Sequence, residues 1–200
     1  MNFLAHIYLS GDDDLLKIGN FIADSIKGKK YLKYPPRIQD GIILHRAIDY
    51  FTDTHPVFRK SVQRLFPAYR HYSGIIVDIF YDHFLAANWE DYSDTPLKDY
   101  SENFYRLLDE NQELLPIKVL NFMPYMIEEN WLYSYRKIDG IQKVLNGMNR
   151  RTGRKSGMNM AVKELEGSYP SFENEFRLFF EELQDFSRIK ITQIDKKKDR

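Results

Sequence analysis

Cysteine is absent from the 200-residue sequence. Its absence excludes thiol catalysis and cysteine-ligated zinc, and it is compatible with a reducing compartment such as the cytosol. A chain of this length buries most of its apolar surface on folding and needs no disulfide or structural metal to hold a core. We therefore expect one sizeable globular domain.

An excess of charge of either sign is absent as well. The 29 Lys and Arg residues balance the 29 Asp and Glu residues. A chain with zero net charge lacks the overall field that marks nucleic-acid and membrane-surface proteins. Neither kind of partner is expected, and a charged partner must be recognised by a local cluster of charge.

Long apolar runs are missing too. The first segment, MNFLAHIYLSGDDD, has no basic residues ahead of its apolar ones, and His6 interrupts the apolar run. Elsewhere no uninterrupted run reaches the length of about 20 residues that a membrane-spanning helix requires. These features predict a soluble, cytoplasmic protein.

Apolar residues recur instead at helical spacing, and the alternation typical of strands is hard to find. The segment 73–89 is apolar nearly all round, so we expect other helices to enclose it. The sequence predicts an all-α, single-domain helical bundle over residues 1–190 and a charged tail over 191–200. The expected helices are residues 15–26, 38–54, 57–66, 73–89, 97–108, 116–135, 138–146 and 172–186.

Proline, glycine and capping residues set the expected helix ends. Residues 94–96 indicate a helix start, with a capping side chain just before a proline of the first turn. Pro67 is expected to end the helix before it, and Pro124 to kink or restart its helix. Asn146 and Gly147 indicate a stop.

Polar residues on the apolar faces of two expected helices are the most informative feature. His45 and Asp49 lie four residues apart within LHRAIDYFTDTHP, residues 44–56, and share the inward face. Asp78 and Asp82 repeat this spacing in the central helix. A carboxylate taken out of water without a partner is strongly unfavourable, so two on one buried face need a cation.

A divalent metal fits these residues better than a basic side chain. Arg46 and Arg59 lie off the apolar stripes, whereas imidazoles beside carboxylates suit Mn²⁺, Mg²⁺ or Fe²⁺. Asp24, in the last turns of the first expected helix, extends the acidic pattern. His6 and the adjacent pair Asp82-His83 are further candidates.

Structural roles are the alternative for each of these residues. A buried histidine beside an aspartate is also typical of a hydrogen-bonded pair that only fixes packing, so His45 and Asp49 alone do not decide between the two. His55 and His71 are expected at helix ends or on the surface. The Phe and Tyr residues are expected in the core, not as a platform for stacked nucleobases.

A metal site of this kind indicates phosphoester hydrolysis. A bound divalent ion lowers the pKa of a water molecule and neutralises phosphoryl oxygens. Two basic segments, KGKKYLK at 27–33 and RRTGRKSG at 150–157, are candidates for contact with a phosphorylated or acidic partner.

Several separated segments together resemble the acyl carrier protein phosphodiesterase family, also called acyl carrier protein hydrolase. In chain order they are MNFLAH, GNFIAD, GIILHRAIDYFTD, DIFYDHFLAANW and NWLYSYRKIDGIQKVLNGM. The resemblance implies a divergent all-α relative of the HD phosphohydrolases that uses Mn²⁺. It also implies hydrolysis of the phosphodiester between a carrier-protein serine and 4′-phosphopantetheine, which gives apo carrier and free 4′-phosphopantetheine.

The resemblance also implies roles for individual residues. Asp49 would orient His45 or join the metal, Arg46 would contact phosphate, and His83 would protonate the departing serine oxygen. The chain departs from the wider superfamily because it has no adjacent His-Asp doublet; the one neighbouring pair is reversed as Asp82-His83. The implied metal ligands are Asp24, His45, Asp78 and Asp82.

An acidic carrier protein is the partner that the resemblance implies. Four basic residues are expected to steer its association, namely Lys29, Lys30, Arg150 and Arg151. Two other functions stay open. One is a metal phosphohydrolase acting on a nucleotide or another small phosphoester, and the other is a non-catalytic helical module whose buried polar pairs only fix its packing.

Overall fold

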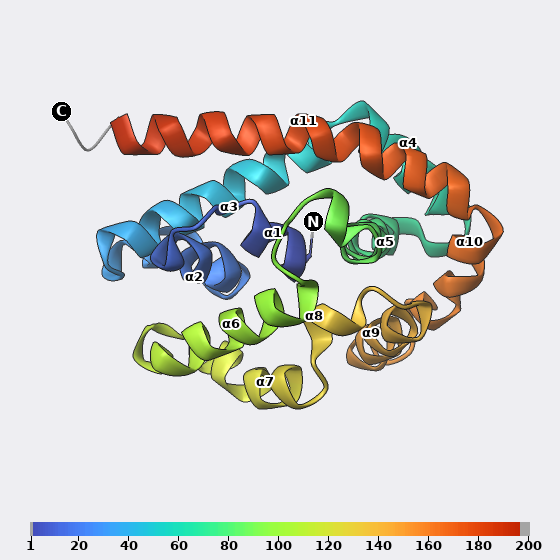
Figure 1. Cartoon of the computed structure of the whole chain (residues 1–200). Coiled ribbons are helices and arrows are strands. Elements are labelled where there is room, and N and C mark those ends of the chain that lie inside the picture. Colours follow the sequence, from blue (N-terminus) through green and yellow to red (C-terminus); the bar gives the residue numbers. More distant parts are fainter. Residues whose placement is uncertain (1, 197–200) are drawn as a thin grey trace.

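The computed structural model describes residues 2–196, and within that range the chain forms helices and no strand. The predicted all-α, single-domain architecture is confirmed (Figure 1). No helix in the described part of the chain combines the length and apolar character needed to cross a bilayer. The α-helices are α1 (Phe3–Tyr8), α2 (Asp14–Ile22), α3 (Pro36–Thr54), α4 (Pro56–Tyr69), α5 (Ser73–Ala87), α6 (Leu97–Glu110), α7 (Ile117–Glu128), α8 (Trp131–Ser134), α9 (Ile138–Arg151), α10 (Ala161–Gly167) and α11 (Tyr169–Lys196).

Short 3-10 helices join several of these elements. They are η1 (Ala23–Ser25), η2 (Gly28–Lys33), η3 (Arg70–Tyr72), η4 (Trp89–Asp91), η5 (Gln112–Leu114) and η6 (Met158–Met160). Asp24 therefore lies in η1, beyond the end of α2 and not in its last turns as predicted. Residues 191–196 continue α11, and the rest of the predicted charged tail lies outside the described residues.

Helix α5 is the centre of the bundle, as its all-round apolar pattern predicts. It contacts α1, α4, α9 and α11, and most of its residues from Ile76 to Ala86 are buried. Helix α11 runs across the top of Figure 1, over α3 and α4. It buries an aromatic face there that includes Phe172, Phe176, Phe179 and Phe180.

Two glycines set the distance between α2 and α3. A Cβ atom on Gly19 would stand 2.3 Å from the carbonyl oxygen of Ile38, and one on Gly41 would stand 2.4 Å from that of Leu16. Both contacts are with backbone, which cannot swing aside. The glycines therefore let the two helices touch, and Asn20 of α2 and His45 of α3 come within hydrogen-bond reach.

The expected helix ends at Pro67 and Gly147 are wrong, and the helix does not restart at Pro124. Helices α4 and α7 continue through Pro67 and Pro124 because both prolines lie on exposed faces, where water can bind the carbonyl oxygens left without a donor. Helix α9 passes Gly147 and ends at Arg151, and Gly153 takes the left-handed conformation with φ +63°. The interruption placed at Pro124 occurs at left-handed Asn130.

Other boundaries were missed for local reasons. The N-cap of α6 is Pro96, without a side-chain hydrogen bond, so the capping side chain expected within residues 94–96 is not used. Helices α1 and α10 have six and seven residues, too few for a helical repeat to be visible in the sequence.

Gly41→Ala is expected to lower the free energy of unfolding by about 2 kcal/mol, because overpacking a tight contact costs about 1–3 kcal/mol. Gly167→Ala is the matched control: its Cβ would meet nothing within 4 Å, and the alanine should be neutral or stabilising. Urea unfolding of the two variants measures the difference. Equal stability of both would contradict the assigned role of Gly41.

Candidate functional site

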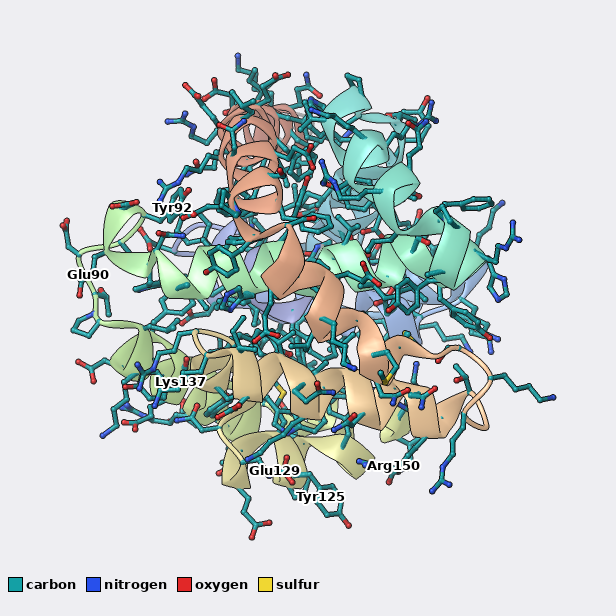
Figure 2. The ribbon with its side chains drawn as sticks, turned by 90° about the vertical axis from the view of Figure 1, so that its right-hand side faces the viewer. Glu90, Tyr92, Tyr125, Glu129, Lys137 and Arg150 are labelled. Carbon is teal, nitrogen blue, oxygen red and sulfur yellow. The ribbon has the colours of Figure 1, made fainter. Side chains whose placement is uncertain are left out.

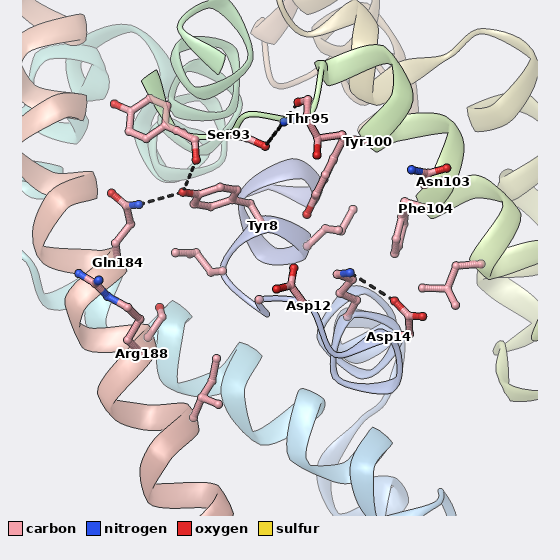
Figure 3. Close-up of a pocket in the computed structure, with 18 of the residues that line it drawn as sticks. Tyr8, Asp12, Asp14, Ser93, Thr95, Tyr100, Asn103, Phe104, Gln184 and Arg188 are labelled. Atoms are coloured by element: carbon pink, nitrogen blue, oxygen red, sulfur yellow. Dashed lines mark hydrogen bonds and ion pairs between the residues drawn. The ribbon is translucent and has the colours of Figure 1, made fainter. Parts of the chain in front are cut away.

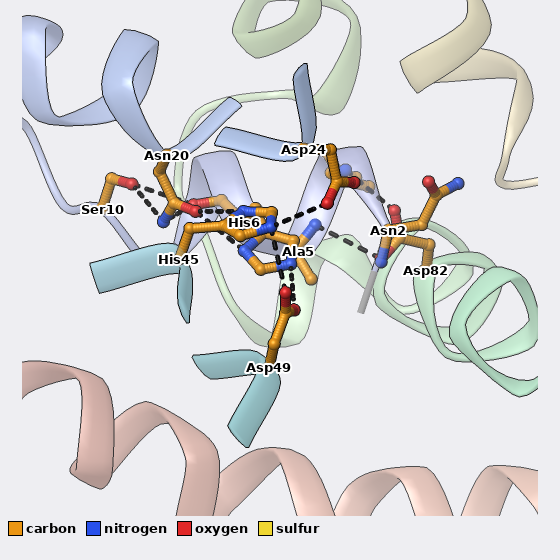
Figure 4. A network of polar contacts seen from close by, with 10 residues as sticks. Asn2, Ala5, His6, Ser10, Asn20, Asp24, His45, Asp49 and Asp82 are labelled. Atoms are coloured by element: carbon orange, nitrogen blue, oxygen red, sulfur yellow. Dashed lines mark hydrogen bonds and ion pairs between the residues drawn. The ribbon is translucent and has the colours of Figure 1, made fainter. Parts of the chain in front are cut away.

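Two histidine rings from separate helices stack at the centre of a polar cluster (Figure 4). His6 belongs to α1 and His45 to α3. Their ring centroids are 4.0 Å apart and the ring planes are inclined by 21°. Both rings are buried. Helix α2, which packs against both α1 and α3, holds the two histidines in this arrangement.

Asn20 of α2 orients both rings. Its Oδ1 lies 2.8 Å from Nδ1 of His6 and 3.1 Å from Nδ1 of His45. Its Nδ2 donates to the carbonyl oxygen of His6 at 2.8 Å and to Oγ of Ser10 at 2.9 Å. Because the amide nitrogen is committed to these acceptors, Oδ1 faces the rings, and each ring donates the hydrogen on its Nδ1. Both Nε2 atoms then face the carboxylates.

Two carboxylates stand on the Nε2 side of the rings. The two oxygens of Asp49 lie 3.3 Å from Nε2 of His6 and 3.1 Å from Nε2 of His45. Oδ1 of Asp24 lies 3.2 Å from Nε2 of His45. The Asp24 side chain is 71% exposed and that of Asp49 is 39% exposed. The cluster is therefore closed on its Asn20 side and open to solvent on its carboxylate side.

The charges of the cluster are strongly coupled. Burial works to lower the pKa of His45, but its hydrogen bonds to Asp24 and Asp49 outweigh that effect and raise the pKa to about 9. Burial and the charge of His45 lower the pKa of His6 to about 4. At neutral pH the metal-free cluster thus holds one imidazolium between two carboxylates, beside a neutral His6.

The two carboxylates respond to the histidines in turn. The hydrogen bond with His45 is the main cause that lowers the pKa of Asp24. Burial works to raise the pKa of Asp49, but its hydrogen bond with His45 and its closeness to both imidazoles hold that pKa well below the usual range. Both groups are therefore ionised at neutral pH and available as ligands.

His6 provides the observation that fits a metal ion. Because its hydrogen is on Nδ1, its Nε2 presents a bare lone pair. That buried nitrogen makes no hydrogen bond to any part of residues 2–196, although Oδ1 of Asp49 is 3.3 Å away. Two lone pairs that face each other repel, and a cation between them replaces the repulsion with coordination.

The spacing of the donor atoms also fits one ion. Ligand atoms of His6, His45 and Asp49 all lie within 4.8 Å of one another. Atoms bound to one ion at about 2.1 Å stand about 3.0–3.4 Å apart at octahedral or tetrahedral angles. Imidazole with carboxylate is a donor set that suits Mn²⁺, Fe²⁺ or Zn²⁺.

The structure does not bring the two aspartates of α5 into this cluster. Asp82 is fully buried and accepts backbone N–H groups at the start of α1, from Leu4 at 2.8 Å, Asn2 at 3.2 Å and Ala5 at 3.4 Å. Burial raises its pKa to about 7. A carboxylate at a helix N-terminus is a favourable arrangement, and this one fixes the helix that carries His6. Asp78 lies one turn earlier, and burial raises its pKa.

His83 and Arg46 also lie outside the cluster. Nδ1 of His83 is 2.7 Å from the carbonyl oxygen of Tyr135, and its Nε2 is 3.0 Å from the hydroxyl of Tyr169. Arg46 donates to the carbonyl oxygen of Gly28 at 2.8 Å, so its guanidinium holds the η1–η2 connection. In these contacts neither His83 nor Arg46 meets the carboxylate of Asp24 or Asp49.

The remaining predicted residues lie on the surface or at a helix junction. Lys29 and Lys30 are exposed in η2, and Arg150 and Arg151 are exposed in the last turn of α9. His55 is the buried N-cap of α4, with Nε2 3.2 Å from Glu182, and His71 is exposed in η3.

The sequence pattern marks His6 only as a further candidate and does not indicate Asn20. His6 occupies a six-residue helix, so no apolar periodicity marks its face. Asn20 lies between apolar residues of α2 and is fully buried. An amide on the buried face of a helix needs hydrogen-bond partners, so Asn20 on the apolar face of α2 could have indicated a polar cluster there.

A larger cavity, of about 730 Å³, lies between α1, α6 and α11 (Figure 3). The hydroxyl of Tyr8 on its wall donates to the carbonyl oxygen of Tyr92 at 3.0 Å and accepts from Gln184 at 3.0 Å. Its charged residues, among them Asp12, Lys17 and Arg188, are of both signs. None of His6, His45, Asp24 and Asp49, the histidine–aspartate cluster, lines this cavity.

Comparison with known proteins identifies the family. The family model described as acyl carrier protein phosphodiesterase matches residues 1–183. A protein of that name from Enterobacter sp. (strain 638) is 33% identical over 181 residues, which cover 90% of this chain and 94% of the relative. One from Klebsiella pneumoniae subsp. pneumoniae is 33% identical over 191 residues, which cover 95% and 99%.

A relative from Salmonella agona, also named acyl carrier protein phosphodiesterase, is 34% identical over 181 residues, 90% of this chain and 94% of the relative. No solved structure matches the chain, so the expected likeness to HD phosphohydrolases stays a prediction. The agreement extends over nearly the whole chain, and the chain belongs to the acyl carrier protein phosphodiesterase family, a family of enzymes.

Proposed function

We propose that this enzyme hydrolyses the phosphodiester between 4′-phosphopantetheine and a serine of holo acyl carrier protein, with a divalent metal ion held by the histidine–aspartate cluster. The family supports the substrate. The single observation that supports the metal is the bare Nε2 of buried His6 facing a carboxylate.

His6, His45 and Asp49 would hold the ion, with Asp24 as a fourth ligand. This set keeps Asp24 and His45 from the sequence-based assignment and leaves out Asp78 and Asp82. It adds the further candidate His6, and of the two roles expected for Asp49 it takes that of a ligand. When bound, such an ion lowers the pKa of a water molecule and neutralises phosphoryl oxygens. Mn²⁺ is the ion expected, with Mg²⁺ or Fe²⁺ as alternatives.

The other residues of the cluster orient the ligands. Asn20 keeps the hydrogen of each imidazole on Nδ1, so that both Nε2 atoms stay available as donors. Asp82 binds the first turn of α1 and so positions His6. The exposed carboxylates of Asp24 and Asp49 mark the side from which a substrate as large as a carrier protein is able to approach.

The carrier would dock through local positive charge, because the chain has no net charge. Exposed Arg150 and Arg151, with Lys29 and Lys30, are the proposed contacts to its acidic surface. These residues would act on association and not on the chemical step.

Asp49→Asn is expected to lower Mn²⁺-dependent release of 4′-phosphopantetheine from holo carrier at least about 100-fold, because it removes a ligand carboxylate and leaves the shape unchanged. Asp53→Asn, one turn further along α3 and exposed, is the matched control and should keep full activity. Undiminished activity of Asp49→Asn would overturn the proposal.

Arg150→Ala with Arg151→Ala is expected to lower kcat/KM for holo carrier while kcat stays near the wild-type value. For the wild type, kcat/KM should fall between low salt and about 0.15 M salt, since the Debye length there is about 8 Å. The double variant should show a weaker salt dependence. Lys163→Ala, an exposed lysine of α10, serves as control, and a salt-independent wild type would rule out electrostatic docking.

A further inference from the structure

A second, narrower cavity is lined by Asn2, one helical turn before His6 of the histidine–aspartate cluster. It has a volume of about 250 Å³ and lies between the start of α1 and helices α7, α8 and α9. Asn2 and Phe3 line it on the side of α1, and Tyr125, Trp131 and Tyr135 supply aromatic walls. Figure 2 shows Tyr125 and Glu129 near Arg150 on the face of the molecule where α7 and α9 meet.

The side of the cavity lined by Asn2 and Phe3 is tied to the cluster by the geometry of α1. Asn2 is the N-cap of α1 and His6 lies four residues further on, so about 6 Å along the helix axis separates them. The backbone N–H of Asn2 is also held by Asp82, which fixes this turn of the chain. Asn2, which lines the cavity, and His6, which belongs to the cluster, are therefore one helical turn apart.

Gly147 lines the cavity at a position where the packing of the helices does not require a glycine. It lies inside α9, where glycine is less favourable than alanine by about 0.5–1 kcal/mol. A Cβ there would meet only the tip of Arg150, at 3.8 Å, so no close contact demands a glycine. By contrast, a Cβ on Gly140 of the same helix would stand only 2.0 Å from the carbonyl oxygen of Ser134. The missing side chain at Gly147 leaves the cavity open.

The lining combines apolar contact with uncharged polar groups. Phe3, Val144 and Met148 offer apolar surface, while Asn2, Ser134 and Tyr135 offer amide and hydroxyl groups. The contact between Asn2 Nδ2 and the Tyr135 hydroxyl is long, 3.4 Å, and is readily exchanged for a bond to a ligand. Ligand sites commonly have about 300–1,000 Å³, so this cavity suits a slim chain better than a nucleotide.

We infer that this cavity receives the pantetheine arm of the substrate, with the phosphate end of the arm toward the histidine–aspartate cluster. The arm is an uncharged chain of methylene groups, a geminal dimethyl group, a hydroxyl and two amides that ends in a thiol, and it matches the mixed lining. The inference rests on the proposed function, since it assigns a place to one part of that substrate.

The charges at the mouth agree with this placement. Three basic residues, Lys143, Arg150 and Arg151, and one acidic residue, Glu129, line the cavity and are exposed, so its charge is mainly positive. These basic side chains have no charged partner on the arm itself, but they can attract the acidic carrier protein to which the arm is attached. Arm and carrier surface would thus be recognised by adjoining parts of α9.

Gly147→Leu tests the inference, because it fills the cavity from a position where added atoms meet open space. The variant should raise KM for holo carrier about tenfold, through loss of arm binding, and should not lower the unfolding temperature, because helix α9 loses an unfavourable glycine. Gly167→Leu, at an exposed glycine with an equally open Cβ position, is the matched control and should keep the wild-type KM. Val144→Phe fills the same cavity from a second wall and should act like Gly147→Leu.

Binding of free pantetheine provides a readout independent of hydrolysis. Trp131 lines the cavity, whereas Trp89 is buried against Tyr8 and Tyr100. Pantetheine should change the tryptophan fluorescence of the wild type, and Gly147→Leu and Trp131→Phe should abolish that change.

The outcomes separate the two proposals. Wild-type hydrolysis of holo carrier with no pantetheine response, and an unchanged KM in Gly147→Leu and Val144→Phe, would overturn the cavity assignment alone. Pantetheine binding without hydrolysis would keep the cavity assignment and overturn the proposed reaction. Absence of both would overturn both.

Discussion

The double hydrogen bond to Oδ1 of Asn20 is the interaction on which the rest of the site depends. One amide oxygen accepts from two imidazoles, and its own NH₂ group is committed to a backbone carbonyl and a serine hydroxyl. Buried polar groups of this kind are stable only when all of them are satisfied. The amide thereby fixes which nitrogen of each ring is free, and those nitrogens converge on Asp49. The proposed binding of a metal ion by the cluster depends on this arrangement.

The scaffold makes that interaction possible through contacts remote from the chemistry. Gly19 and Gly41 let α2 and α3 approach closely enough for Asn20 to reach His45. Asp82 binds the N-terminus of α1 and keeps His6 over the second ring. A buried carboxylate on the central helix is thus explained by three backbone N–H groups, whereas the sequence pattern alone suggested a cation beside it.

The sequence predicted the helices that repeat their apolar pattern over several turns and the pair His45 and Asp49 on one face of α3. It could not place His6, because a helix of six residues shows no period, nor could it show that α1 lies beside α2 and α5. Spacing alone also did not separate Asp49, which joins the histidines, from Asp78 and Asp82, which do not. Which of these aspartates meets the histidines depends on how separate helices pack. The spacing of residues within one helix gives no information on that packing.

The central claim is that the two imidazoles, Asp49 and Asp24 surround a divalent ion. A crystal structure of the protein soaked with Mn²⁺, with anomalous differences measured, tests it most directly. The account predicts one peak bounded by Nε2 of His6, Nε2 of His45 and the carboxylate of Asp49. A peak at Asp78 and Asp82, or a cluster that stays free of metal at saturating Mn²⁺, would contradict it.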